Sequence, residues 1–234
     1  MLRIIQRFPN ENTIPSTAQT EPQELTMEDA FAGYSELIQA GFEHFHGIPY
    51  LNKAGEVKWE GKALFRYVGA EDQIHFPGNS IVLTLPEGWA DNVTVVYSGT
   101  NIRLYNNFIW DAQTEFWASM YPDKTIETLD DPYYDYMLII KALPHSFFEE
   151  NQDHFLKPDP HNPFEGIYVG EDINFVYWAV IAGDEYYDNE RYHVQRLLIE
   201  KIGQDAYDAL VGNLVVQDYE MVQDMITLST QTHP

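Results

Sequence analysis

The spacing of hydrophobic residues changes twice along this chain, from a helical period to a strand period and back again. In residues 26–47, apolar side chains recur at intervals of three and four, which predicts a helix with one buried face. Thr26 is a suitable N-cap, and Gly41 or Gly47 is the expected end of this helix. The apolar positions are Met27, Phe31, Tyr34 and Ile38.

The middle of the chain has a period of two. Its short runs, from VKWEGKALFRYV through QIHF, SIVLTL and VTVVYS to NIRLYN, alternate or are rich in β-branched and aromatic residues. The clusters PGN, PEGWADN and SGTN between them are turn formers. These connections are too short for parallel crossovers, so residues 48–107 are predicted to form a small antiparallel β-domain of about four or five strands.

From residue 108 to residue 234 the spacing is interpreted as helical. Asp131 and Pro132 are a good N-cap and first helical residue for one of these helices, which Pro144 is expected to kink or split. The predicted helices are IWDAQTEFWASMY, DDPYYDYMLIIKALPHSFFEENQDHF, INFVYWAVIAG, EYYDNERYHVQRLLIEKIG and QDAYDALVGNLVVQDYEMVQDMITL.

Residues 1–25 contain three prolines among polar residues and read as an extended arm. The predicted fold class is therefore α+β: a small antiparallel β-domain flanked by N-terminal and C-terminal helices, with an extended N-terminal arm. The chain is divided into an arm (1–25), a helix (26–47), a β-domain (48–107) and a helical region (108–234).

The charge of the chain limits its partners. There are 37 acidic and 13 basic residues, a formal net charge of −24, and 22 of the acids but only 6 of the bases follow residue 120. Sequence-specific nucleic-acid binding is not expected, because phosphates are bound by lysine and arginine. An acidic surface favours solubility, attraction to a basic partner, or passage of DNA without adhesion.

Other functional classes are limited by what the sequence lacks. With no cysteine, disulfides, thiolate zinc sites and cysteine nucleophiles are excluded. No apolar run is long enough for a signal peptide or a membrane span, so we expect a soluble protein made in the cytoplasm, with no membrane partner. No nucleophile motif of the G-x-S-x-G type is present, and we expect no enzymatic activity and no cofactor.

The stretch GFEHFHGIPY places His44 and His46 two residues apart, which suggests either a metal site or the end of a helix. If the helix runs to Phe45, the two imidazoles diverge by about 200° and cannot bind one ion together. We interpret the pair as packing or capping groups at a helix end.

A better collection of metal ligands occurs in DHFLKPDPHNPFEG, whose carboxylates and imidazoles suit a divalent ion. The spacing matches no established metal-binding pattern, and a proline-rich acidic connector explains the same composition. No metal site is therefore predicted, and the weak candidate ligands are Asp153, His154, Asp159, His161 and Glu165.

The order of segments resembles the tail tubular protein A type of head-to-tail adaptor of short-tailed phages, over about residues 26–156. Adaptors of this type have an I-x-x-P-x-N strand, an R-x-x-x-L-Y hairpin and a P-x-x-x-x-Y-I helix. The corresponding stretches here are IHFPGNSIV, GTNIRLYNN and LDDPYYDYMLIIKALPHSFFEE. The spacing, the arm and the long acidic C-terminal region depart from that pattern. The matching residues are Ile74, Pro77, Asn79, Leu104, Tyr105, Pro132, Tyr136 and Ile139.

The resemblance implies a non-enzymatic ring subunit of the virion, commonly dodecameric, seated between portal protein and tail nozzle with DNA crossing its lumen. It implies self-association, with the arm and tyrosine-rich surfaces in contact with neighbours. Two alternatives are an acidic inhibitor or immunity protein that covers a basic toxin or nuclease, and a metal-dependent hydrolase. The expected assembly residues are Phe8, Ile14, Tyr105, Tyr133 and Tyr136.

Overall fold

The computed structural model describes residues 34–54, 56–120, 136–156, 166–181 and 188–229. The predicted arm, the expected N-cap Thr26, and Asp131 with Pro132 lie outside these residues. Among the described helices, none is long and apolar enough to span a membrane.

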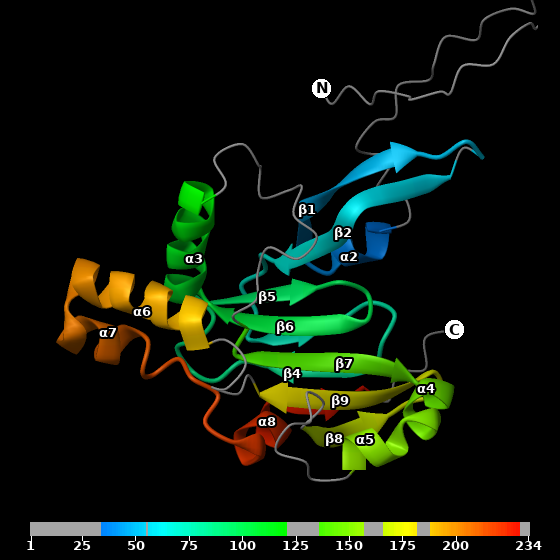
Figure 1. Ribbon diagram of the computed structural model, residues 1–234. Helices are drawn as coiled ribbons and strands as arrows, with labels where there is room; N and C mark the ends of the chain where they lie inside the picture. The colour runs from blue at the N-terminus through cyan, green and yellow to red at the C-terminus, as the bar shows by residue number, and fades with distance from the viewer. Residues whose placement is uncertain (1–33, 55, 121–135, 157–165, 182–187, 230–234) are drawn as a thin grey trace, which may run out of the picture.

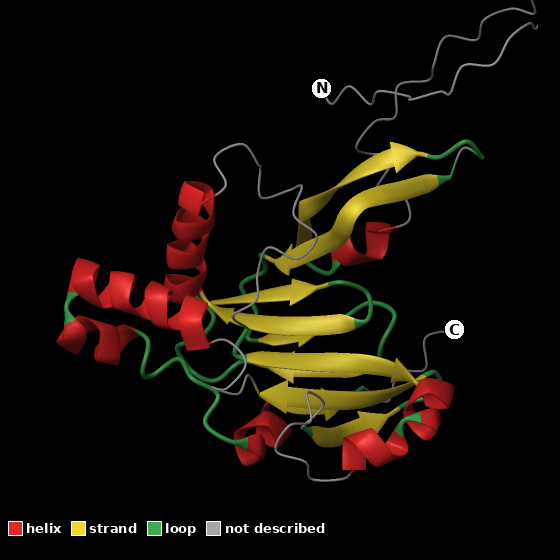
Figure 2. Cartoon of the chain, in the orientation of Figure 1, coloured by secondary structure: helices red, strands yellow, loops and turns green. Residues whose placement is uncertain are grey.

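A seven-stranded antiparallel sheet forms the larger layer of the molecule (Figures 1 and 2). Its two edge strands are β1 and β8, and every neighbouring pair in it is antiparallel. In spatial order the strands are β1 (Phe42–Leu51), β2 (Val57–Tyr67), β5 (Val93–Tyr97), β6 (Asn101–Asn106), β7 (Leu138–Pro144), β9 (Phe175–Ile181) and β8 (Ile167–Glu171).

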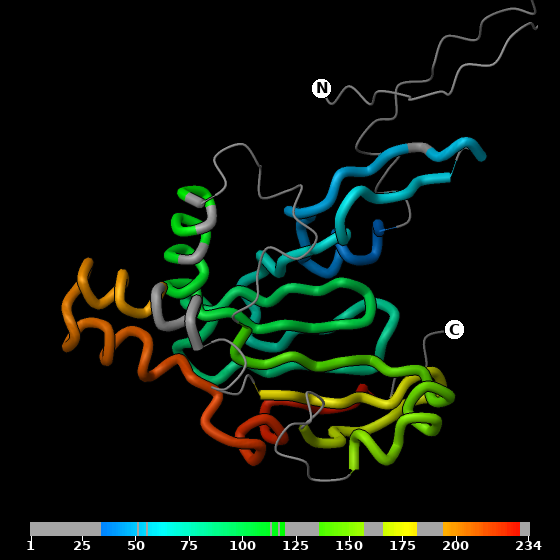
Figure 3. The backbone as a smooth tube through the Cα atoms, in the orientation of Figure 1, coloured from blue at the N-terminus to red at the C-terminus, as the bar shows by residue number. Residues whose placement is uncertain are grey.

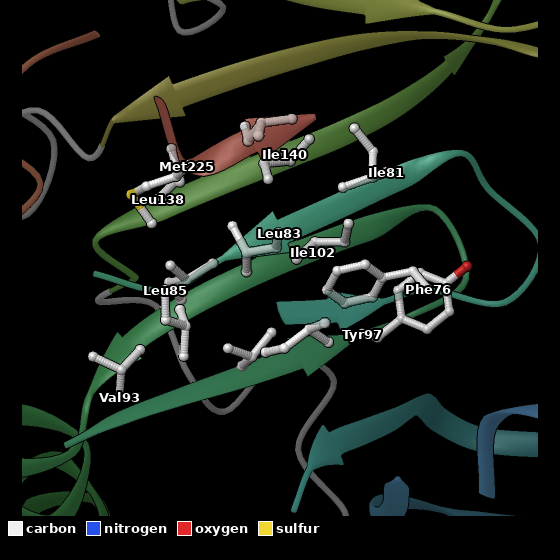
Figure 4. Close-up of a cluster of buried hydrophobic side chains, with 14 of the residues drawn as sticks. Phe76, Ile81, Leu83, Leu85, Val93, Tyr97, Ile102, Leu138, Ile140 and Met225 are labelled. Atoms are coloured by element: carbon white, nitrogen blue, oxygen red, sulfur yellow. The ribbon is translucent and has the colours of Figure 1, made fainter. Parts of the chain in front are cut away.

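A three-stranded sheet covers one face of the large sheet. Its strands, in spatial order, are β10 (Ile226–Leu228), β4 (Ile81–Thr84) and β3 (Gln73–His75). Figure 4 shows side chains of β4 facing those of β6 and β7, with Leu83 near Ile102. Because alternate residues of a strand face the same side, each strand contributes every second side chain to this core. The result is a two-layer sandwich with short helices around its edges.

Seven short helices occur in the described part of the chain. In Figure 3, α3, α6 and α7 lie together beside the sheets, and α4 and α5 lie near the far end of β7. The Nζ atom of Lys201 on α6 lies 3.2 Å from a carboxylate oxygen of Glu115 on α3. The helices are α2 (Ser35–Gln39), α3 (Asn107–Met120), α4 (His145–Glu150), α5 (Gln152–Leu156), α6 (Asp188–Ile202), α7 (Gln204–Leu210) and α8 (Tyr219–Met225).

The α+β class and the antiparallel pairing are confirmed. The predicted helix over residues 26–47 is wrong beyond Gly41, the earlier of its two expected ends. The chain leaves α2 at Gly41, whose φ of 85° is a conformation that glycine adopts without strain. Phe42 then begins β1 instead of continuing the helix. Only a two-residue turn, Ala40 and Gly41, therefore separates α2 from the first strand.

The prediction that residues 108–234 are helical is also wrong in part. Helices α3 and α6 occur where they were expected, but LIIKALP is strand β7 and FVYWAVI is strand β9. Both strands are largely buried, and a short apolar run that is buried on both faces has the same pattern in a strand as in a helix. Pro144 ends β7 and precedes α4 rather than kinking a helix.

Candidate functional site

The β1–β2 hairpin extends beyond the body of the molecule (Figure 1). β2 pairs with β5 only at Phe65 and Arg66, whereas residues 57–60 pair with residues 48–51 of β1. We call residues 48–60 the distal hairpin. A two-stranded ribbon is marginally stable by itself, so an arm of this length has little structural benefit for its own subunit.

Local hydrogen bonds close the tip of the distal hairpin. The side-chain oxygen of Asn52 accepts hydrogen bonds from the backbone N–H groups of Ala54 and Glu56, both at 2.9 Å. The amide nitrogen of the same side chain donates to the Glu56 carboxylate at 2.8 Å. Asparagine stabilises turns in this way, by replacing a backbone acceptor with its side chain. The tip is therefore shaped by the hairpin's own residues.

The two faces of the distal hairpin differ. On the inner face, the Trp59 ring lies 5.8 Å from the ring of Tyr34 and 5.0 Å from that of His44. On the outer face, Tyr50 is paired directly with Lys58 across the strands, and Ile48 with Glu60. Strand alternation places Lys62 on this outer face too. Since Tyr50 is 39% exposed and Lys58 is exposed, the outer face offers apolar and basic groups together, with the exposed carboxylate of Glu60 between the two lysines in sequence.

The charge of the hairpin differs from that of the rest of the chain. Residues 42–67 hold four of the 13 basic residues and only three of the 37 acidic ones, a net charge of +1 against −25 for the remainder. Within it, Lys58 forms an ion pair with Glu56 at 3.4 Å, and Arg66 forms one with Glu43. The basic residues of this segment are Lys53, Lys58, Lys62 and Arg66.

The two histidines lie in β1 and not at a helix end, as the sequence had suggested. His44 is opposite Phe65 and His46 is opposite Leu64, consecutive residues of β2, because β1 is irregular on either side of His46. His46 is fully buried, with Nδ1 2.9 Å from the carbonyl oxygen of Lys62. Burial lowers the pKa of His44, and the charge of His46 adds to this effect.

No cluster of three or more metal-ligating side chains occurs among the residues that the structure describes. Of the weak metal candidates, Asp153 and His154 are neighbours in the short helix α5. Asp159, His161 and Glu165 lie outside the described residues. The structure therefore does not bring the five candidates together.

The expected assembly residues are placed only in part. Tyr105 is 1% exposed, and its ring lies 4.7 Å from that of Trp110, so its expected position on an assembly surface is wrong. Tyr136 is partly buried and packs against the hydrophobic cluster that contains Tyr105. Phe8, Ile14 and Tyr133 lie outside the described residues.

Two residues of the phage-adaptor resemblance shape the loop before β4. The side chain of Asn79 accepts a hydrogen bond from the backbone N–H of Ile81 at 3.0 Å, and the Pro77 carbonyl accepts one from the hydroxyl of Tyr97 at 2.9 Å. Burial raises the pKa of Tyr97 to about 12. These residues hold the loop in place and are not arranged as a reactive group.

A polar cluster that the sequence did not reveal joins this loop to the large sheet. The Asp172 carboxylate accepts hydrogen bonds from the hydroxyls of Ser80, at 2.8 Å, and Tyr177, and from the backbone N–H groups of Asn174 and Phe175, at 2.7 and 2.9 Å. The Ser80 N–H donates to the Tyr177 hydroxyl at 2.9 Å. Burial alone raises the pKa of Asp172, but these hydrogen bonds outweigh it and hold the pKa below its ordinary value.

A groove of about 410 Å³ lies between the end of β4 and α8, and we call it the α8 groove. Leu85, Pro86, Met221 and Met225 give it apolar walls. Its other lining residues are Thr84 and the acidic Asp218, Glu220 and Asp224. The groove therefore combines negative charge with apolar surface, the complement of the outer face of the distal hairpin.

Comparison with known proteins gives no match: no family model, no curated protein and no solved structure is significantly similar to this chain.

Proposed function

We propose that this chain is a non-enzymatic structural protein of a phage virion, a subunit of a head–tail adaptor or connector ring that joins portal to tail and lets DNA pass. The observation that carries the proposal is the distal hairpin, which leaves the body and adds little to its own core. A hairpin that projects in this way is suited to contact with another molecule.

The charge distribution supports the same function. Outside the hairpin the chain carries a net charge of −25, and an acidic channel wall repels the phosphate backbone of DNA. The weak resemblance to phage adaptors over about residues 26–156 also supports a location in the virion. The partners on this proposal are further copies of the chain, the portal protein and tail proteins such as the nozzle.

The same acidic surplus favours a second candidate, an inhibitor or immunity protein that covers a basic toxin or nuclease. Such a protein acts as a monomer or a dimer and needs no projecting hairpin. The two candidates differ in the mass of the protein in solution.

The test is light scattering of the purified full chain over a range of concentrations, together with two shortened variants. One variant lacks residues 1–25. In the other, Asn-Gly replaces residues 50–58, so that Pro49 and Trp59 remain paired across a two-residue turn. Circular dichroism of each variant verifies that the sandwich is intact.

We expect the full chain to form a large closed oligomer, and the shortened hairpin to reduce its mass. A strict monomer at every concentration, unchanged by either shortening, contradicts the adaptor proposal and favours the inhibitor.

A further inference from the structure

We infer that the outer face of the distal hairpin of one copy docks in the α8 groove of the next copy, so that copies associate head to tail. This inference rests on the proposed self-assembly and names the two surfaces that meet. The hairpin side consists of Ile48, Tyr50, Lys58 and Glu60 of the distal hairpin with the adjoining Lys62, and the groove side of Leu85, Met221, Glu220 and Asp224.

The first argument is charge complementarity within one chain. Basic residues are scarce in this chain, yet two of the 13, Lys53 and Lys58, lie in the distal hairpin that projects from the body, and Lys62 follows it directly. The α8 groove has three carboxylates and no basic residue among its lining residues. Opposite charges that meet in this way fix the register of an interface and exclude wrong partners.

The second argument is that both surfaces have apolar area beside the charges. Tyr50 and Ile48 lie among the lysines of the hairpin, and tyrosine is enriched in the buried centres of interfaces. In the groove, Leu85, Met221 and Met225 provide apolar contact, and methionine adapts its shape to a partner. The groove volume is within the range of binding sites.

The third argument is the position of the two surfaces. The hairpin contains β1, the first edge strand of the large sheet, whereas α8 leads into β10, which contacts the last edge strand, β8. Two different surfaces at opposite ends of a subunit produce a heterologous contact. Heterologous contacts close into rings when the rotation between copies allows it, which is the geometry an adaptor needs.

Two charge-reversed variants test the contact by light scattering. The hairpin variant carries Lys58→Glu and Lys62→Glu, and the groove variant carries Glu220→Lys and Asp224→Lys. Asp218 is left unchanged because its carboxylate caps α8 through the backbone N–H of Met221.

The control variant reverses Glu149 and Glu150, exposed acids on α4, with the same change of charge as the groove variant. We expect half-assembly of the hairpin variant and of the groove variant to require at least about a tenfold higher concentration than the wild type. The control keeps the mass of the wild type.

Mixing the two variants gives the decisive result. The intact hairpin of the groove variant fits the intact groove of the hairpin variant. At the other junction the reversed, acidic hairpin faces the reversed, basic groove, so both junctions between unlike variants bring opposite charges together. We expect the mixture to recover the assembly that neither variant shows alone, because every junction in an alternating assembly is attractive. A mixture that assembles no better than its components contradicts the inference.

Several outcomes overturn the inference. If the wild type assembles and the variants assemble equally well, these surfaces do not meet, although self-assembly stands. If the hairpin variant keeps its mass but loses a wild-type affinity for a short DNA duplex, the hairpin faces nucleic acid instead. If the wild type is a monomer, the proposed function and the inference fail together.

Discussion

Replacing Tyr177 by phenylalanine removes one oxygen atom from the polar cluster that joins the loop before β4 to the large sheet. The ring of Tyr177 is fully buried, and phenylalanine preserves its packing. The change leaves the Ser80 N–H without its acceptor and removes one of the four donors to Asp172. An unsatisfied buried donor costs about 1–3 kcal/mol. The Ser80 N–H is partly buried and Asp172 loses a donor as well, so we expect a loss of about 2 kcal/mol in the free energy of unfolding.

Thermal unfolding followed by circular dichroism measures this loss. For a chain of this size, about 2 kcal/mol lowers the melting temperature by about 4–8 °C. Tyr168→Phe is the matched control, because Tyr168 lies on the neighbouring strand but is 46% exposed. An exposed hydroxyl contributes little, so the control is expected within about 0.5 kcal/mol of the wild type.

The effect of pH provides a second readout. The folded state holds the pKa of Asp172 below its ordinary value, so the carboxylate stabilises the protein above about pH 4 and loses this effect as the pH falls through the folded-state pKa. Tyr177 is one of the donors that lower this pKa, so the gap between wild type and Tyr177→Phe narrows below pH 4. Equal melting temperatures of the two proteins at pH 7 refute the reasoning.

Three further substitutions test the core, the first hairpin and its histidine. Leu83→Ala, at a fully buried site between the sheets, is expected to cost about 3–5 kcal/mol in urea unfolding, whereas Leu156→Ala, at a site 56% exposed, costs far less. Gly47→Ala places a Cβ 2.7 Å from the carbonyl oxygen of Lys62 in β2, whereas Gly88→Ala, at a residue with a similar φ, places one in open space. Gly47→Ala is therefore expected to lower the free energy of unfolding more than Gly88→Ala does. Equal losses of the two variants in urea unfolding contradict this contact. Burial lowers the pKa of His44, so stability falls as the pH drops below about 6.5, and His44→Phe is expected to flatten that decline when unfolding is measured at pH 5 and pH 7.

The strand pattern of the middle of the chain predicts its antiparallel pairing because turns and alternation are local properties. The same local pattern does not show that β3 and β4 leave the large sheet and form a second one. Their core residues, such as Ile74 and Leu83, look the same in sequence whichever sheet they join. Assignment to a sheet depends on pairing with β10, about 145 residues away along the chain.

The candidate site shows the same division between local and distant information. The basic character of residues 42–67 is readable from the sequence, but its projection from the body is not. Ser80 is separated from Asp172 by 92 residues and from Tyr177 by 97, so no spacing rule connects them. Tyr105 looks like a surface tyrosine in sequence but is buried, because Trp110 of α3 and Tyr136 pack on its face of the sheet.

The pairing of β10 with β4 has a consequence for how the protein is made. The small sheet needs residues 226–228, about 145 residues after β4, to complete the layer that covers the main core. During synthesis the hairpins of the large sheet form first, and the apolar side chains of β4 stay incompletely covered until β10 has been made. A chain cut before residue 226 therefore lacks a closed sandwich, so the core is complete only after β10 has been synthesised.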